Sequence, residues 1–121
     1  MASETDDRRF TVAVRTVEGA LLLTLGGELD HDTAAPLKQA LDEAADRGGR
    51  LVVDMAGLDF CDSTGLNALL HGRLALQEVG GSLELAGLSG PVARMFRITG
   101  ADGVFPVHAD VAQALGSVQG R

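Results

Sequence analysis

The segment from Leu51 to Leu66 constrains the fold more than any other part of this chain. It opens with an apolar run, Leu51 to Met55, that only Asp54 interrupts. A strand with so little alternation is covered on both faces, which is typical of a parallel sheet packed between helices. The chain then leads to Asp62-Ser63-Thr64-Gly65, and a helix is expected to follow over about residues 64–79. The segment therefore predicts an α/β protein with a strand-to-helix junction at Ser63.

Hydrophobic periodicity and glycine pairs divide the rest of the chain into further elements. Alternating apolar residues predict a first strand, and Gly26-Gly27 is expected to end the second. Pro106 confines its strand to a sheet edge, because proline donates no backbone hydrogen bond. Strands are expected at residues 10–17, 21–25, 51–55, 82–86 and 104–107, and helices at about 36–47, 64–79, 91–98 and 109–118. This succession predicts an α/β fold with a mixed, mostly parallel β-sheet of four to five strands and about four helices.

Domain organisation follows from the same pattern. Residues 10–118 are expected to form a single domain, and the charged residues 1–9 a flexible N-terminal tail. On the helix expected over 64–79, leucines including Leu74 are assigned to the core face. A second strip, made of small residues apart from Val79, allows close approach of a neighbouring helix or of a partner protein: Ala68, Gly72, Ala75 and Val79.

Composition excludes several function classes. The net charge is −7, and aromatic residues make up 3% of the chain, with no Trp and no Tyr. Neither phosphate-backbone binding nor base stacking is expected, so no nucleic acid is predicted as a partner. No secretory segment or membrane-spanning run is found, which favours a cytoplasmic protein with no membrane partner. Cys61 is the only cysteine, and it is interpreted as a buried apolar side chain at a strand end.

Ser63 stands where a helix is expected to begin. Unpaired backbone N–H groups and the helix dipole favour negative charge at such a position. A phosphoserine is therefore compatible with the fold, and the site suits a switch that changes charge. Ser63 is equally suited to be a helix N-cap, worth roughly 1 kcal/mol. Taken by themselves, Asp62 reads as a cap and Asp30 as a turn residue.

Several segments together resemble one known family. The strongest is Val53-Asp54-Met55 followed by Phe60-Cys61-Asp62-Ser63-Thr64-Gly65-Leu66. Gly27-Glu28-Leu29-Asp30 and the stretch beginning at Gly80-Gly81-Ser82 also match. The chain is similar in these segments to the anti-sigma factor antagonists, small proteins with the STAS (sulfate-transporter and anti-sigma-antagonist) fold. Two departures are Asn67, where a second glycine is frequent, and Cys61, where methionine is common.

The resemblance implies a function by partner switching. Such proteins bind an anti-sigma factor that is also a serine kinase, and this binding frees a sigma factor for transcription. The serine after the motif aspartate, here Ser63, is then phosphorylated, and a serine phosphatase reverses the change. The implied partner-binding residues are Asp30, Asp62, Ser63, Thr64, Gly65 and Asn67. A monomer or weak dimer is expected.

Enzymatic activity is the main rival interpretation. Ser63 lies in no Gly-x-Ser-x-Gly elbow, and a triad needs one of His31, His71 or His108 beside it. Only His31, in the loop before the first helix, remains a candidate base. Metal-ligand spacing is absent, so no catalytic residue, metal or cofactor is predicted. Another alternative is a STAS module of a different signalling complex, or a nucleotide-binding regulator, that does not act on a sigma factor.

Overall fold

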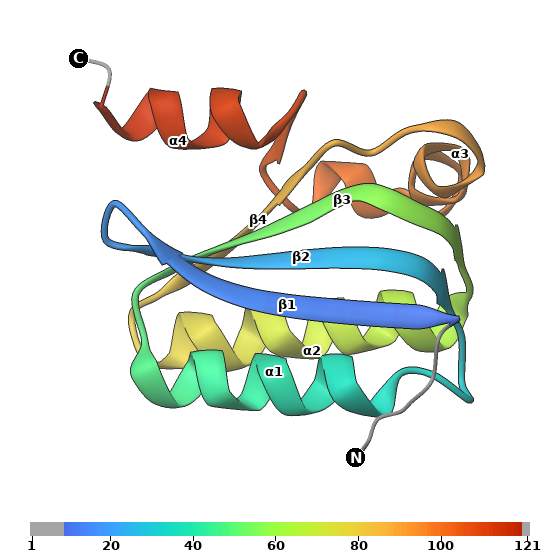
Figure 1. Cartoon of the computed structure of the whole chain (residues 1–121), viewed down its shortest axis with the longest axis horizontal. Helices are drawn as coiled ribbons and strands as arrows, with labels where there is room; N and C mark the ends of the chain where they lie inside the picture. Colours follow the sequence, from blue (N-terminus) through green and yellow to red (C-terminus); the bar gives the residue numbers. More distant parts are fainter. Residues whose placement is uncertain (1–8, 120–121) are drawn as a thin grey trace.

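The computed structural model describes residues 9–119, which form one mixed sheet and the helices around it (Figure 1). Within these residues five strands are paired in the order β1-β2-β3-β4-β5. β1 runs antiparallel to β2, and the other neighbours are parallel. The elements are β1 Phe10–Val17, β2 Ala20–Leu29, α1 Ala35–Arg47, β3 Arg50–Cys61, α2 Ser63–Glu78, β4 Ser82–Ala86, α3 Gly90–Thr99, the 3₁₀ helix η1 Ala101–Gly103, β5 Val107–His108 and α4 Val111–Gln119. The predicted fold class, with its mostly parallel sheet, is confirmed. Most of the tail expected over residues 1–9 lies outside the described residues.

Two helices cover one face of the sheet. α1 and α2 lie side by side beneath it in Figure 1, and between the two layers lies the main core, including Leu23, Val53 and Leu85. The α1–α2 contact is close, since a Cβ added to Gly72 would stand 3.1 Å from Leu41 Cδ2. The strip of small residues on α2 therefore serves a neighbouring helix. Leu74, expected in the core, is 51% exposed, because it lies on the side of α2 that faces away from the sheet and α1.

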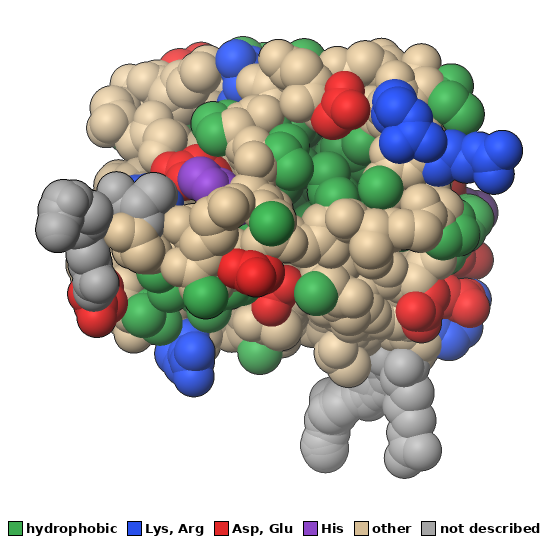
Figure 2. Space-filling model, turned by 90° about the horizontal axis from the view of Figure 1, so that it is seen from above, with side chains coloured by type: hydrophobic (Ala, Val, Ile, Leu, Met, Phe, Trp, Pro, Cys, Tyr) green, Lys and Arg blue, Asp and Glu red, His purple; other side chains and the backbone are tan. Residues whose placement is uncertain are grey.

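The opposite face carries α4. A separate buried cluster lies between this helix and the sheet and consists of Leu22, Val52, Ala86 and Ala114. Figure 2 views the molecule from that side and shows hydrophobic side chains gathered near the centre of the face. Successive side chains of a strand thus point alternately into the two cores, as expected for a parallel strand covered on both faces.

β2 and β3 both extend beyond their expected ends. Gly26 and Gly27 do not stop β2, which continues to Leu29 through two register shifts against β3. Gly27 has φ +88°, and a Cβ on it would lie 1.9 Å from the carbonyl oxygen of Arg9. The glycine pair therefore makes an irregularity that bends the strand and admits the backbone of Arg9. As a result, β2 and β3 end together at the junction with Ser63.

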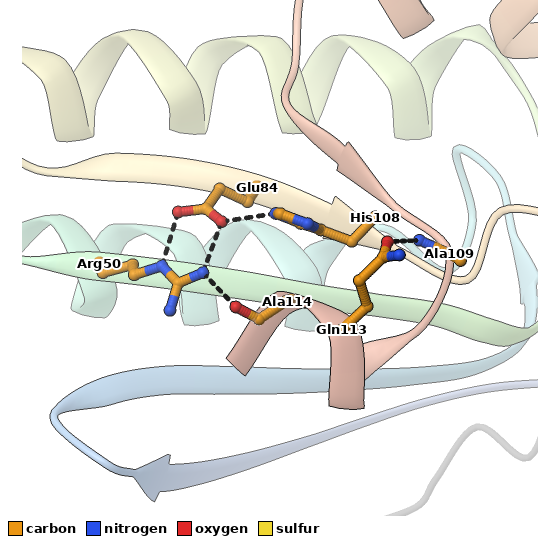
Figure 3. A network of polar contacts seen from close by, with 6 residues as sticks. All are labelled: Arg50, Glu84, His108, Ala109, Gln113 and Ala114. Atoms are coloured by element: carbon orange, nitrogen blue, oxygen red, sulfur yellow. Dashed lines mark hydrogen bonds and ion pairs between the residues drawn. The ribbon is translucent and has the colours of Figure 1, made fainter. Parts of the chain in front are cut away.

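The C-terminal part also differs from expectation in its boundaries. β5 is limited to Val107–His108 and begins after Pro106 instead of at residue 104. Its predicted place at the sheet edge is confirmed by the strand order. A polar network then connects α4 to the sheet (Figure 3). Arg50 donates to both carboxylate oxygens of Glu84 at 2.7 Å and to the carbonyl oxygen of Ala114 at 2.8 Å. His108 Nε2 lies 2.8 Å from Glu84 Oε1.

Candidate functional site

The site lies where β2 and β3 end next to each other. Leu29 and Cys61 are register partners in the parallel pair, and the N–H of Asp62 donates to the carbonyl oxygen of Leu29 at 3.1 Å. Asp30 and Asp62 are the next residues along the two strands. The fold therefore brings together two acidic residues that are far apart in the sequence.

Asp62, and not Ser63, is the N-cap of α2. Its backbone is extended, with φ −99° and ψ −172°, and its Oδ1 accepts from the N–H groups of Thr64 at 2.9 Å and Gly65 at 3.2 Å. Ser63 is the first helical residue. The interpretation of Ser63 as a cap is thus wrong, because a capping side chain must belong to the residue just before the first helical turn.

The hydroxyl of Ser63 is consequently available. Its side chain is exposed, and it makes no hydrogen bond with another residue of the part that the structure describes. The cap beside it already satisfies two N–H groups of the first turn. The helix therefore begins without help from this hydroxyl, and a change at Ser63 Oγ leaves the cap in place.

Asp30 organises the loop between β2 and α1. Its Oδ1 accepts from the N–H groups of Asp32 at 2.9 Å and Thr33 at 3.1 Å. Thr33, which is 2% exposed, donates its hydroxyl to the carbonyl oxygen of Glu28 at 2.9 Å. The structural interpretations of Asp30 as a turn residue and of Asp62 as a cap are both correct. Each carboxylate is only half-buried, so each also contributes negative charge to this surface.

Gly65 and Cys61 pack the junction from inside. A Cβ on Gly65 would lie 2.7 Å from Leu29 Cδ2 and 2.9 Å from Cys61 Sγ, so only glycine lets α2 approach the two strand ends this closely. Burial, and then the charge of Asp62, raise the pKa of Cys61 to about 12. The thiol stays protonated at neutral pH, which agrees with its interpretation as a buried apolar group. Gly65 is itself buried, and its visible role is to position the helix.

Thr64 and Asn67 line a groove between α1 and α2. The groove has a volume of about 520 Å³, and its floor is formed by Leu41 and the small residues Ala68 and Gly72. Charged side chains from α1 stand at its border, Lys38 and Asp42. Asn67 is exposed and Thr64 half-buried. These two predicted site residues therefore belong to a hollow surface that begins beside Ser63.

The segments that form the junction are acidic. The sequence contains no Lys or Arg between Arg15 and Lys38, and none between Arg50 and Arg73. These two stretches nevertheless hold Glu28, Asp30, Asp32, Asp59 and Asp62. Such a surface attracts a basic partner and repels added negative charge.

The arrangement around Ser63 does not resemble a hydrolytic triad. His31 Nε2 lies 3.3 Å from Asp32 Oδ1, and both side chains are exposed. His108 is held by Glu84, and His71 lies two helical turns from Ser63, about 12 Å along α2. In the described part of the chain no histidine is hydrogen-bonded to Ser63, so no base is in place to activate it. Among residues 9–119 no cluster of three potential metal ligands occurs, and no helix there is long and apolar enough to cross a bilayer.

Two groups of residues were missed by the sequence analysis. The first is the Arg50–Glu84–His108 network, whose members lie on three different strands. The second is Phe60, which is 47% exposed beside the junction. Counting back from a buried Cys61 with a period of two would have placed Phe60 on the opposite face. Because the strand was expected to end at Met55, no face was predicted for Phe60.

Comparisons with known proteins agree on one family. The family model "Mlab, STAS domain" matches residues 12–108. An anti-sigma F factor antagonist of Paenibacillus polymyxa is 30% identical over 99 residues, 80% of this chain and 85% of that protein. The anti-sigma-F factor antagonist RsfB of Mycobacterium tuberculosis is 33% identical over 114 residues, 92% and 91% of the two chains. The crystal structure of an anti-sigma factor antagonist from Mycobacterium paratuberculosis superposes with a TM-score of 0.82 at 28% identity, covering 91% of this chain and 94% of that one.

Proposed function

This chain belongs to the STAS-domain family of the anti-sigma factor antagonists, and we propose that it switches the partners of a sigma factor. It binds an anti-sigma factor that is also a serine kinase, and the sigma factor is thereby freed for transcription. The kinase phosphorylates Ser63, the phosphorylated antagonist dissociates, and a serine phosphatase restores the original form. Because its partners control transcription, the protein acts in the cytoplasm, as one domain spanning residues 10–118.

The observation that carries this proposal is the free hydroxyl of Ser63 at the first residue of α2. The side chain is exposed, and the neighbouring Asp62 makes the cap in its place. A kinase has access to this oxygen without unfolding the helix. Phosphorylation of Ser63 therefore removes no side-chain hydrogen bond on which the helix depends.

The residues around Ser63 have different roles in the proposed interface. Asp30 and Asp62 hold the loops with one carboxylate oxygen each, and they present negative charge to a basic partner. Thr64 and Asn67 extend the contact surface along the α1–α2 groove. Gly65 acts by letting α2 pack against Leu29 and Cys61. The interface is thus charged at its centre and hollow on one side.

The energetics favour release without unfolding. A phosphate adds a charge of about −1.5 to −2, next to Asp62 and near Asp30. In the free domain the helix N-terminus favours negative charge by about 0.3–1 kcal/mol. In a complex, desolvation and any opposing carboxylate cost several kcal/mol. A hundredfold loss of affinity requires only about 2.8 kcal/mol, so phosphorylation weakens the complex far more than the fold.

Phosphate transfer and binding to an anti-sigma serine kinase of the same genome test the proposal. With ATP, the kinase should add one phosphate, to Ser63, as mapped by mass spectrometry. Thr64→Ala is the matched control, since it removes the adjacent hydroxyl and should leave this phosphate in place. Ser63→Ala should take up none. Phosphate mapped to Thr64 in the wild type would contradict the assignment.

Calorimetric titration then separates charge from shape. Ser63→Ala should bind the kinase as tightly as the unmodified wild type, because no charge is added. Ser63→Glu should bind more weakly, and the phosphorylated wild type more weakly still, by about a hundredfold or more. Equal affinities for all three forms would place Ser63 outside the interface and refute release by repulsion.

A further inference from the structure

Phe60 is unlike the other aromatic residues of this chain. The sequence has four Phe and no Trp or Tyr. Phe10, Phe96 and Phe105 are at most 5% exposed, whereas Phe60 is 47% exposed. A half-exposed aromatic ring offers a large apolar area at a small cost in conformational entropy, which is why such residues are frequent anchors of interfaces.

The position of Phe60 in the sheet explains its exposure. β4 pairs with β3 only from Arg50 to Asp54, and beyond that point β3 is paired with β2 alone. Cys61 faces the core, so Phe60 projects to the other face of this two-stranded extension. Ser63 lies three positions after Phe60, a span of at most about 11 Å between their Cα atoms. The ring and the Ser63 hydroxyl lie at the same end of β3, so a partner that covers this end contacts both.

Acidic residues flank Phe60 along the chain and across the strand pair. Asp59 precedes it and, by the alternation of the strand, points to the opposite face. Glu28 is its register partner on β2, a strand about 4.8 Å away. Asp62 follows two residues later, and the whole stretch between Arg50 and Arg73 contains no Lys or Arg. An apolar group in an acidic stretch, with Glu28 as its neighbour on β2, fits an apolar pocket bordered by Lys or Arg. It does not fit a second copy of the same acidic surface, since like charges would then face one another.

We propose that Phe60 is the apolar anchor that this antagonist inserts into its anti-sigma partner, in a pocket bordered by basic side chains. The inference rests on the proposed function and adds a contact that phosphorylation does not alter. The ring supplies affinity, and phosphorylation of Ser63, three positions away, lowers that affinity through its negative charge. The same end of β3 thus carries the side chain that provides affinity and the side chain whose phosphorylation weakens binding.

Calorimetric titration against the same anti-sigma serine kinase tests the anchor. Phe60→Ala should weaken binding at least tenfold, and Phe60→Leu should fall between it and the wild type. Leu74→Ala is the matched control, because Leu74 is similarly exposed at 51% but lies about 16 Å farther along α2 from Ser63. It should bind within twofold of the wild type. Thermal unfolding of each variant verifies that the fold is retained.

A salt series distinguishes the ring from the carboxylates around it. Phe60→Ala should weaken binding equally at low and high salt, whereas Glu28→Gln and Asp59→Asn should flatten the salt dependence. Unchanged affinity of Phe60→Ala, together with weakened binding of Ser63→Glu, would overturn the anchor and leave the proposed function standing. A wild type that binds no anti-sigma kinase would overturn both. A loss of self-association in Phe60→Ala, measured by sedimentation, would assign the ring to a dimer contact instead.

Discussion

At the scale of single residues, neighbouring side chains at the α2 N-terminus have separate tasks. Asp62 caps the helix, Ser63 presents a free hydroxyl, and Gly65 admits Leu29 and Cys61. This division explains how the proposed modification of Ser63 is compatible with a structurally demanding position. The residue proposed to change charge is not the one that caps the helix.

Stability measurements on two adjacent alanine variants check this division. Asp62→Ala removes the acceptor of two backbone N–H groups and should lower the free energy of unfolding by about 0.5–2 kcal/mol. Ser63→Ala should change it by no more than about 0.5 kcal/mol, as is usual for an exposed side chain without a partner. Urea unfolding followed by circular dichroism measures both. A larger loss in Ser63→Ala than in Asp62→Ala would show that Ser63 is the cap after all.

At the scale of elements, α4 depends on a polar network as well as on its small apolar cluster. Arg50, Glu84 and His108 have side-chain exposures of only 20%, 13% and 19%. The Arg50 hydrogen bonds lower the pKa of Glu84, and the pKa of Arg50 is raised by the same contact. Since Arg50 also donates to Ala114, the network fastens α4 across strands β3, β4 and β5.

The lowered pKa of Glu84 predicts a pH-dependent contribution to stability. A carboxyl whose folded pKa lies below its unfolded value stabilises the fold above the unfolded value, near 4.5. That contribution disappears as the pH falls through the lower, folded pKa. Glu84→Gln should therefore be less stable than wild type by about 1.5–3 kcal/mol at pH 7, with the difference shrinking below about pH 4.5.

Urea titrations at several pH values measure this difference. Glu43→Gln is the control, because it removes the same charge from an exposed carboxylate on α1 that lies outside the network. A stability gap between wild type and Glu84→Gln that stays constant from pH 7 to pH 3 would rule out the ionised network as its cause.

At the scale of the whole molecule, one sheet connects two cores. α1 and α2 pack on one face and α4 on the other, and β2 and β3 contribute residues to both. The functional junction stands at the end of these two shared strands (Figure 1). A sheet covered on both faces thus carries the surface on which we propose that phosphorylation acts.

Calorimetry should show a single unfolding transition for the full chain. The shared strands couple the two cores, so the calorimetric and van't Hoff enthalpies should agree, at about 80 kcal/mol for a domain near 110 residues. The form phosphorylated on Ser63 should unfold within a few degrees of the unmodified protein, because the helix N-terminus tolerates the charge. A separate early transition, or a large drop on phosphorylation, would instead mean that release involves partial unfolding.

The sequence by itself determined the kinds of elements, their order and the nature of the junction. These depend on short-range patterns: the apolar run from Leu51 to Met55, the glycines that end α1 and α2, and the tetrad that begins a helix. It also indicated an acidic protein whose Ser63 suits phosphorylation. Such features follow from neighbours within one or two turns of the chain, so they can be read locally.

The tertiary structure decided what depends on residues far apart in the sequence. β2 continues past Gly26-Gly27, because the bend there accommodates the backbone of Arg9. The pairing of Leu29 with Cys61 places Asp30 beside Asp62. Phe60 is exposed where β3 extends beyond its pairing with β4. The Glu84 network joins residues 24, 34 and 64 positions apart. Hydrogen bonds and close contacts of this range exist only once the chain is packed, since no local pattern specifies which distant group will be the partner.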